Sequence, residues 1–163
     1  MPEVFKCKYP WSPAALRDGS RRCRQCGPCR RWLQSEWTSR LLLEAVSNPS
    51  WPFFITLTYS DERVPSIQEA SGYARRFPQY LREQGLTVRY FLCTELGSKT
   101  SRVHHHAICW IPQWNGYSDK TLFQMDRSKI WPYGHSSVSA IRKVGAFRYV
   151  TKYVQKSREL PTG

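Results

Sequence analysis

Three consecutive histidines are the residues of this sequence best suited to metal chemistry. They lie in the run Val103-His104-His105-His106-Ala107-Ile108. On a β-strand, alternate side chains share a face, so His104 and His106 point to one side and His105 points to the other. Two imidazoles side by side suit a divalent metal ion. The run therefore predicts that His104 and His106 are metal ligands.

An acidic residue ends the strand expected just before this run. The loop LGSKTSR is short enough to join the two strands as a hairpin. If Glu95 lies opposite His104, their Cβ atoms are roughly 5 Å apart, and Glu95 completes a Glu-His-His set. The same register brings Cys93 opposite His106, so a zinc-like His, His, Cys, Glu set is an alternative. We favour Glu95 with the two histidines and Mg²⁺ or Mn²⁺, because phosphoryl chemistry needs vacant coordination positions and an oxygen-preferring ion.

A second reactive pattern lies near the end of the sequence, in YVTKYVQK. At helical spacing, one stripe is formed by Tyr149, Lys152, Tyr153 and Lys156. A tyrosine oxygen can attack a DNA phosphate and become its 5′ ester, and lysines can stabilise the negative charge. We therefore expect two nucleophiles one helical turn apart. The opposite, apolar face of the same helix is expected to comprise Val144, Phe147, Val150 and Val154.

Four cysteines form a third pattern. Cys23, Cys26 and Cys29 make a CxxCxxC run, and Cys7 lies upstream. Four thiolates make a closed tetrahedral zinc site, and a metal would explain how a segment poor in apolar residues folds. An iron–sulfur cluster also fits this spacing. Zinc is favoured because nothing else in the sequence indicates redox work.

The elements that must position these residues can be predicted from hydrophobic periodicity. Residues 1–29 read as loop. Helices are expected at 30–47, 71–84 and 143–157, and strands at 53–59, 87–95, 103–110 and 135–141. Phe53, Ile55, Leu57 and Tyr59 are expected on one face of the first strand, and Cys93 and Cys109 are expected to be buried. Strands interleaved with helices, with one antiparallel hairpin, predict an α+β fold with a single sheet and helices packed on it.

Composition indicates the kind of partner. The chain of 163 residues has 25 Lys and Arg against 12 Asp and Glu, a net charge of +13. That excess favours a polyanion, of which nucleic acid is the usual one. No stretch approaches the roughly 20 apolar residues of a membrane span, and residues 1–10 lack the apolar core of a signal peptide. The sequence therefore predicts a soluble, intracellular protein with no membrane partner.

Taken together, these motifs resemble the replication initiators of microviruses, the small single-stranded DNA phages, especially the gokushovirus branch. That group belongs to the HUH endonucleases, which are named for two histidines around a hydrophobic residue. The resemblance covers most of the chain in order. It rests on CxxCxxC, FITLTYSDERVP, the acidic-to-histidine hairpin, WPYG at 131–134 and YVTKYVQK. The His-x-His strand followed by YVxKYVxK is its specific part.

The resemblance implies a rolling-circle initiator that nicks and rejoins single-stranded DNA through a 5′-phosphotyrosine intermediate. It implies catalytic Tyr149 and Tyr153, assisted by Lys152 and Lys156, and a Mg²⁺ or Mn²⁺ ion on His104, His106 and Glu95. The fold it implies is an antiparallel, ferredoxin- or RRM-like sheet at 31–163, preceded by a zinc-binding segment at 1–30 that holds Zn²⁺ on Cys7, Cys23, Cys26 and Cys29. The expected partners are a replication origin and host replication proteins, in the cytoplasm of a bacterial host.

Two residues depart from the family pattern. His105 stands where a hydrophobic residue is preferred, and Val103 stands where proline is common. The sequence also ends soon after the tyrosine helix, so a catalytic fragment of a longer protein is expected. Two alternatives remain open. One is a relaxase or single-strand transposase of the same superfamily, and the other is a non-catalytic zinc module that binds nucleic acid.

Overall fold

The computed structural model of this chain describes residues 6–13, 22–97, 101–125 and 128–156. Four antiparallel strands form one sheet in the order β2-β3-β1-β4. The strands are β1 (Pro52–Thr58), β2 (Arg89–Leu96), β3 (Val103–Trp110) and β4 (Ser136–Ala140). The helices are α2 (Gly27–Ser47), α3 (Ile67–Glu83), α4 (Asp119–Gln124) and α5 (Gly145–Lys156), with a short 3-10 turn, η2, at Pro112–Trp114. The predicted α+β class with a single antiparallel sheet is confirmed.

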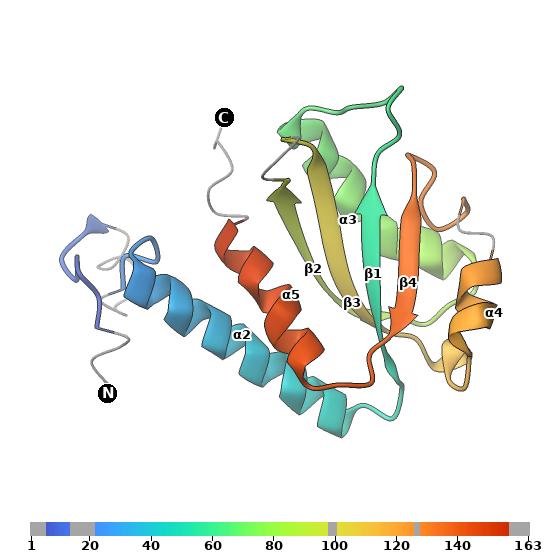
Figure 1. The fold of residues 1–163 in the computed structure, drawn as a ribbon, viewed down its shortest axis with the longest axis horizontal. Coiled ribbons are helices and arrows are strands. Elements are labelled where there is room, and N and C mark those ends of the chain that lie inside the picture. The colour runs from blue at the N-terminus through green and yellow to red at the C-terminus, as the bar shows by residue number, and fades with distance from the viewer. Residues whose placement is uncertain (1–5, 14–21, 98–100, 126–127, 157–163) are drawn as a thin grey trace.

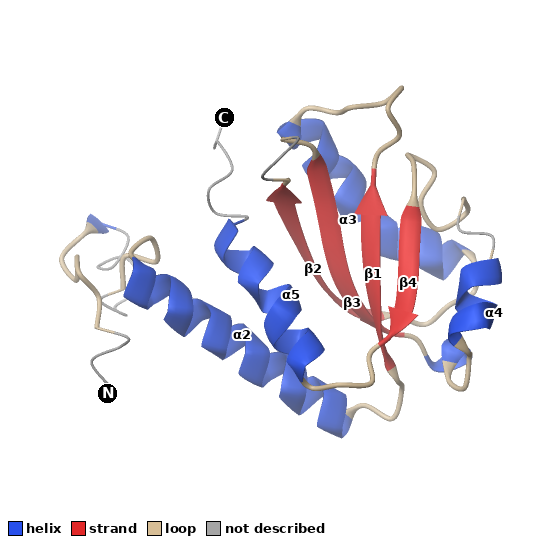
Figure 2. Ribbon diagram, viewed as in Figure 1, coloured by secondary structure: helices blue, strands red, loops and turns tan. Residues whose placement is uncertain are grey.

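Helices cover both faces of the sheet (Figures 1 and 2). Helix α3 packs behind β2 and β3, whereas α5 crosses in front of the same strands and α2 lies along the outer side of α5. Helix α4 packs beside β4 at the opposite edge. His106 of β3 and the two tyrosines of α5, Tyr149 and Tyr153, meet on the front face, between the sheet and α5.

The alternating pattern of β1 explains why the sheet has two different faces. Phe53, Ile55 and Leu57 are completely buried on the α3 side, together with Phe77 and Leu81 of α3. The intervening side chains of β1 are only half-buried and face α5. A strict period of two puts every second residue into the larger core, as the sequence predicts.

The front face has its own, smaller core. Phe147, Val150 and Val154 of α5 pack with Leu41 of α2 and with Ile108 of β3. Two polar contacts add to this packing: the Thr38 and Thr151 hydroxyl oxygens lie 2.8 Å apart, and the Gln34 amide donates to the Arg148 carbonyl. Because α5 packs against both α2 and the sheet, its orientation over β3 is fixed on two sides.

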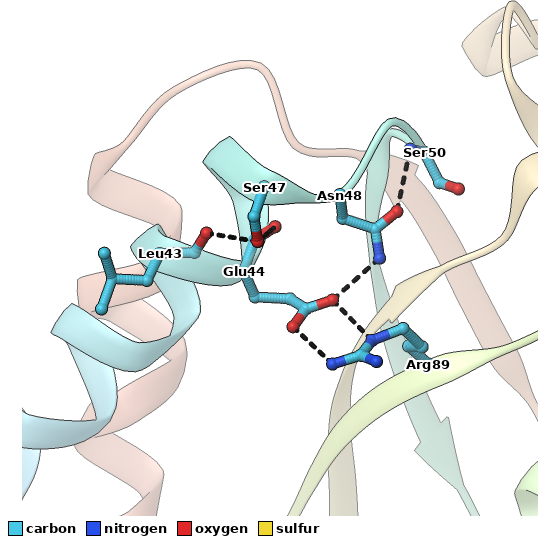
Figure 3. Close-up of polar contacts among 6 residues, drawn as sticks. All are labelled: Leu43, Glu44, Ser47, Asn48, Ser50 and Arg89. Carbon is cyan, nitrogen blue, oxygen red and sulfur yellow. Dashed lines mark hydrogen bonds and ion pairs between the residues drawn. The ribbon is translucent and has the colours of Figure 1, made fainter.

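A polar network fixes the C-terminal end of α2 to the sheet (Figure 3). The Glu44 carboxylate accepts two hydrogen bonds from the Arg89 guanidinium, at 2.6 and 2.7 Å, and a third from the Asn48 side-chain amide. Asn48 in turn accepts a hydrogen bond from the Ser50 backbone N–H. Two-point pairing of a guanidinium with a carboxylate fixes orientation as well as distance. The network therefore ties α2 to the first residue of β2.

Several predicted boundaries need correction. Helix α2 begins at Gly27, inside the predicted loop, because Pro28 suits a first helical turn. Helix α3 begins at Ile67 rather than 71, because Ser66 and Glu69 form a capping box. Helix α4 was not predicted. Helix α5 begins at Gly145 rather than 143, and Val144 is exposed rather than part of an apolar face.

Membrane insertion can be judged for the described residues. None of the helices there is long and apolar enough to cross a membrane.

Candidate active site and cysteine cluster

The β2–β3 hairpin has the register predicted from its loop length. Glu95 pairs with His104, and Cys93 pairs with His106. These four side chains therefore share the front face of the sheet, and His105 points to the back. The register confirms the predicted separation of the histidine run into two faces.

His106 is the more buried of the two front-face histidines. Its ring stacks on Tyr153, with centroids 4.1 Å apart, and lies parallel to Phe54 of β1 at 5.7 Å. Its Nε2 atom lies 3.8 Å from Glu95 Oε1 and makes no hydrogen bond to any described residue. Burial lowers the pKa of His106 to about 4, against the opposing effect of Glu95. The ring is therefore neutral near pH 7, with a buried nitrogen directed toward a carboxylate.

His104 lies beside the turn that joins β2 to β3 and is only half-buried. Burial lowers its pKa, Glu95 opposes that effect, and Arg102 adds to it. Among the described residues, the four cysteines are the one group of three or more His, Cys, Asp or Glu side chains gathered as metal ligands. The strand register thus brings His104, His106 and Glu95 to one face without gathering their ligand atoms around one point.

His105 is a structural residue of the rear core. It is completely buried, and its Nε2 and Nδ1 atoms lie 2.8 Å from the Tyr59 hydroxyl and the Thr94 hydroxyl respectively. Trp131 packs edge-on against the ring. A buried imidazole with both nitrogens bonded is a satisfied polar group. This explains how a histidine occupies an interior strand position where an apolar residue is expected.

The two tyrosines of α5 meet over the histidine strand. The Tyr153 hydroxyl donates a 2.6 Å hydrogen bond to the Tyr149 hydroxyl, and the rings are perpendicular at 5.4 Å. Tyr153 is buried at 5% exposure, whereas Tyr149 is 49% exposed. Burial and the neighbouring Tyr149 raise the pKa of Tyr153. The two hydroxyls therefore converge, but in different surroundings.

The predicted division of α5 into an apolar face and a Tyr/Lys face is only partly correct. Tyr153 packs in the front core with Val150 and Val154 rather than on a separate solvent face. The reason is that a phenol ring buries as much apolar surface as an aliphatic side chain, with only its hydroxyl requiring a partner. The Lys152 ammonium lies 3.9 Å from the Tyr149 ring centroid and 5.0 Å from that of Tyr153. The side chain of Lys156 lies outside the described part of the structure.

The four predicted cysteines come together at the outer end of α2, away from the sheet (Figure 1). The potential ligand atoms of Cys7, Cys23, Cys26 and Cys29 all lie within 4.8 Å of one another. All four are free thiols, and the last three are buried. Burial opposes ionisation of Cys26, but backbone hydrogen bonds from Lys8 and Cys29 lower its pKa to about 6. The cluster could hold a metal such as zinc, because four cysteine thiolates are a common ligand set for a structural zinc ion.

Sequence reasoning missed the residues that support the histidines. Thr56 of β1 pairs with His106 of β3, and its hydroxyl oxygen lies 3.4 Å from Nδ1 of the His106 ring. Tyr59 and Thr94 hold His105. The alternation of buried and half-buried side chains along β1 could have indicated that Thr56 faces the site, because Thr56 lies on the same face of the strand as Phe54. The pairing of β1 with β3 could not be predicted from the length of a connecting loop, because α3 and β2 lie between these two strands in the sequence.

Comparison with known proteins places the chain. Residues 52–158 match the family model described as replication-associated protein ORF2/G2P. This range covers β1 to the end of the tyrosine helix, so the paired histidines and tyrosines lie within it. The chain therefore belongs to the replication-associated protein ORF2/G2P family.

A curated relative agrees with this assignment. The chain is similar to the "Replication-associated protein ORF2" of Spiroplasma virus 4, with 29% identity over 157 residues. The alignment covers 82% of this chain and 47% of that protein, so the chain spans about half the length of the relative it matches. No solved structure matches the chain significantly. Family and relative together support a role in viral replication.

Proposed function

We propose that this chain nicks and rejoins single-stranded DNA to initiate rolling-circle replication, using a tyrosine of α5 as nucleophile. The observation that carries the proposal is the convergence of the Tyr149 and Tyr153 hydroxyls, 2.6 Å apart, above a strand that presents His104 and His106. Membership of a replication-associated family and the similarity of the FITLTY, His-x-His and YVxKYVxK patterns to microvirus initiators support it.

The proposed step is a transesterification. The tyrosine oxygen attacks the scissile phosphorus, so a Tyr–O–P bond forms as the P–O3′ bond breaks. The phenol loses its proton, and the departing 3′ oxygen gains one. One phosphodiester is exchanged for another, so the reverse attack by a 3′ hydroxyl rejoins the strand without ATP. A second tyrosine one turn away can cut again while the first retains the old 5′ end.

We further propose that the histidine face binds a divalent ion once its ligand atoms close around it. The buried, neutral Nε2 atom of His106 lacks a hydrogen-bond partner among the described residues and lies 3.8 Å from the Glu95 carboxylate. A lone pair beside a carboxylate is a donor set for a cation. His104, His106 and Glu95 would hold Mg²⁺ or Mn²⁺, which would polarise the phosphate. Cys93 also faces this site and is the donor that a zinc-like alternative would use. We prefer Mg²⁺ or Mn²⁺, because phosphoryl transfer needs an oxygen-preferring ion with vacant coordination positions.

Lys152 is the cation placed to stabilise the phosphate. Its ammonium lies 3.9 Å from the Tyr149 ring centroid and 5.0 Å from the Tyr153 ring centroid, so it is near both candidate nucleophiles. We assign the same role to Lys156 from its place one turn further along α5. The cysteine cluster would hold Zn²⁺ as a structural ion, remote from the tyrosines. The DNA partner would be a replication origin, with host replication proteins extending the 3′ end.

The proposal is tested with labelled single-stranded oligonucleotides that tile the viral genome. Nicking at one site is expected with Mg²⁺ or Mn²⁺ and is expected to stop in excess EDTA. His104→Ala is expected to lower the rate by roughly 10²-fold or more, since a metal ligand is lost. Glu83→Ala, which removes an exposed carboxylate at the end of α3, is the control. DNA binding without cleavage in any of the tiles would favour the non-catalytic zinc module instead.

A further inference from the structure

A groove runs along the free edge of the sheet. Strand β2 is the first strand in the sheet order, so one of its two edges is unpaired with any described strand. The groove has a volume of about 890 Å³ and follows this edge. Helix α2 forms its front wall and α3 forms its rear wall. Nothing in the proposed nicking chemistry uses this surface.

Aromatic side chains line the groove. Trp37 of α2 packs against Phe91 of β2, with ring centroids 5.0 Å apart. Tyr90, also in the lining, is 46% exposed, so its ring is accessible from solvent. Unpaired bases stack on exposed aromatic rings of this kind, whatever their sequence.

Cations stand on both walls. Arg40 projects from α2 beside the Trp37 ring, and Arg75 projects from α3; both side chains are exposed. Arg89 also lines the groove, but Glu44 already neutralises it through two hydrogen bonds, as Figure 3 shows. Arg40 makes a longer ion pair, 3.7 Å, with Glu36, and both of those side chains are exposed to solvent. The charge most open to a ligand therefore comes from Arg75 and from Arg40, whose exposed pair is weaker than that of Arg89. Cations on two walls with aromatic rings between them are complementary to a phosphate backbone with unpaired bases.

The groove leads to the tyrosine site. Its lining includes Cys93, which pairs with His106 across the hairpin, and Val154, which follows Tyr153. A strand lying along β2 would therefore reach the strand partner of His106 and the residue that follows Tyr153. This continuity favours DNA over an unrelated ligand.

We propose that the groove between α2 and α3 binds the single-stranded DNA that flanks the nick. Bases stack on Tyr90 and on the Trp37–Phe91 pair, and phosphates contact Arg40 and Arg75. The proposal rests on the proposed function, which it deepens by naming the surface that holds the substrate. The other occupant chemically suited to an open strand edge is an added peptide strand, and the experiments below distinguish it.

The first experiment measures binding of the full chain to fluorescent oligodeoxythymidine at several salt concentrations. The variant Arg40→Glu/Arg75→Glu should weaken binding roughly tenfold or more and reduce the slope of log affinity against log salt by about 1.4, for two lost phosphate contacts. Lys120→Glu/Lys129→Glu is the matched control, because it changes net charge equally with exposed residues near the opposite edge of the sheet. Equal effects in both variants would overturn the proposal.

The second experiment removes a stacking surface without changing charge. Tyr90→Ala should weaken oligodeoxythymidine binding roughly tenfold, as expected for one lost base contact, and leave the salt slope unchanged. Ultraviolet crosslinking followed by peptide mass spectrometry should then place the crosslinked thymidines on β2 or α2 in the parent chain. Crosslinks confined to other surfaces, together with normal DNA binding by Tyr90→Ala, would contradict DNA binding in the groove and favour a peptide strand as its ligand.

Failure of the groove and failure of the proposed function can be told apart. Oligodeoxythymidine binding needs no cleavage, so a chain that never nicks can still show the groove effect. Conversely, the arginine variant could bind like the Lys120→Glu/Lys129→Glu control and Tyr90→Ala like the parent chain, while the parent chain nicks its origin. In that case the nickase proposal stands and the groove assignment is wrong.

Discussion

His105 and His106 are neighbours in the sequence but belong to opposite sides of the molecule. The Nε2 atom of His106 faces the tyrosines with no hydrogen-bond partner in the part of the chain that the structure describes, whereas both nitrogens of His105 are bonded in the rear core. Strand alternation alone separates these two environments. It also explains why a histidine at position 105, where a hydrophobic residue is expected, leaves the front face unchanged.

Replacing His105 is expected to damage folding rather than chemistry. His105→Ala leaves a cavity and removes the 2.8 Å partners of the Tyr59 and Thr94 hydroxyls, and Tyr59 keeps only a 3.4 Å bond to the Ala70 carbonyl. It should therefore destabilise the protein by about 2–4 kcal/mol. Urea unfolding measures this change. His104→Ala, at a half-buried position, is the matched control and should change stability by less than about 1 kcal/mol. Equal loss of stability in the two variants would contradict the two-face assignment.

The tyrosines should differ in their roles because they differ in access. Tyr149 is about half exposed and accepts the hydrogen bond from Tyr153, which is buried against His106. A scissile phosphate can therefore reach Tyr149 first. Tyr149→Phe is expected to slow the first cleavage by roughly 10²-fold or more, since a nucleophile is lost. Tyr153→Phe should retain first cleavage and impair the second. Single-turnover cleavage of an origin oligonucleotide measures the first step, and the reverse order of effects would refute this assignment.

At the scale of elements, local patterns explain which predictions held. The period of two in FFITLTY and the short loop between Glu95 and His104 determine strand faces and hairpin register, because both are local. The start of α3 was also encoded locally, in the capping box of Ser66 and Glu69, but was missed. The burial of Tyr153 could not be predicted, since it depends on α2 and the sheet closing around α5.

The WPYG motif is explained by a close approach of two backbone segments. Residues 133–135 pair with the end of β1 through hydrogen bonds between Thr58 and His135 and between Ser60 and Tyr133. The Trp131 indole donates to the Thr58 carbonyl. A Cβ atom on Gly134 would lie 2.4 Å from the Ser60 nitrogen, so only glycine fits.

Gly134→Ala should therefore lower stability by about 1–3 kcal/mol, as expected for overpacking against backbone. Thermal unfolding measures the loss. Gly72→Ala in α3 is the matched control, because nothing lies within 4 Å of its added methyl group. That variant should be neutral or slightly more stable, because alanine favours helix. An unchanged melting temperature for Gly134→Ala would show that the segment moves aside freely.

At the scale of the whole molecule, α2 joins two separate centres. Its N-terminal end carries the cysteine cluster beyond the sheet, and its later turns support α5 (Figure 1). The two metals proposed here would thus serve different parts of the chain. One would fold the N-terminal segment, and the other would serve the tyrosine face.

Elemental analysis should accordingly find about one zinc per chain, as a four-thiolate site predicts. Cys26→Ser should lose this zinc, whereas Cys93→Ser, on the histidine face, should retain it. Chelation should expose the N-terminal segment to protease before the sheet unfolds, because the cluster lies away from both cores. Loss of zinc in Cys93→Ser alone would point instead to the alternative site with His104, His106 and Glu95.

The most direct measurement is mass spectrometry of the protein trapped on its cut DNA. After digestion, a nucleotide is expected on the peptide that contains Tyr149 or Tyr153, joined through a 5′ phosphate. Tyr149→Phe/Tyr153→Phe should still bind single-stranded DNA, because only two hydroxyls are removed, and should form no covalent adduct. A covalent adduct in that double variant, or a modified residue outside α5, would contradict the assignment of the nucleophile.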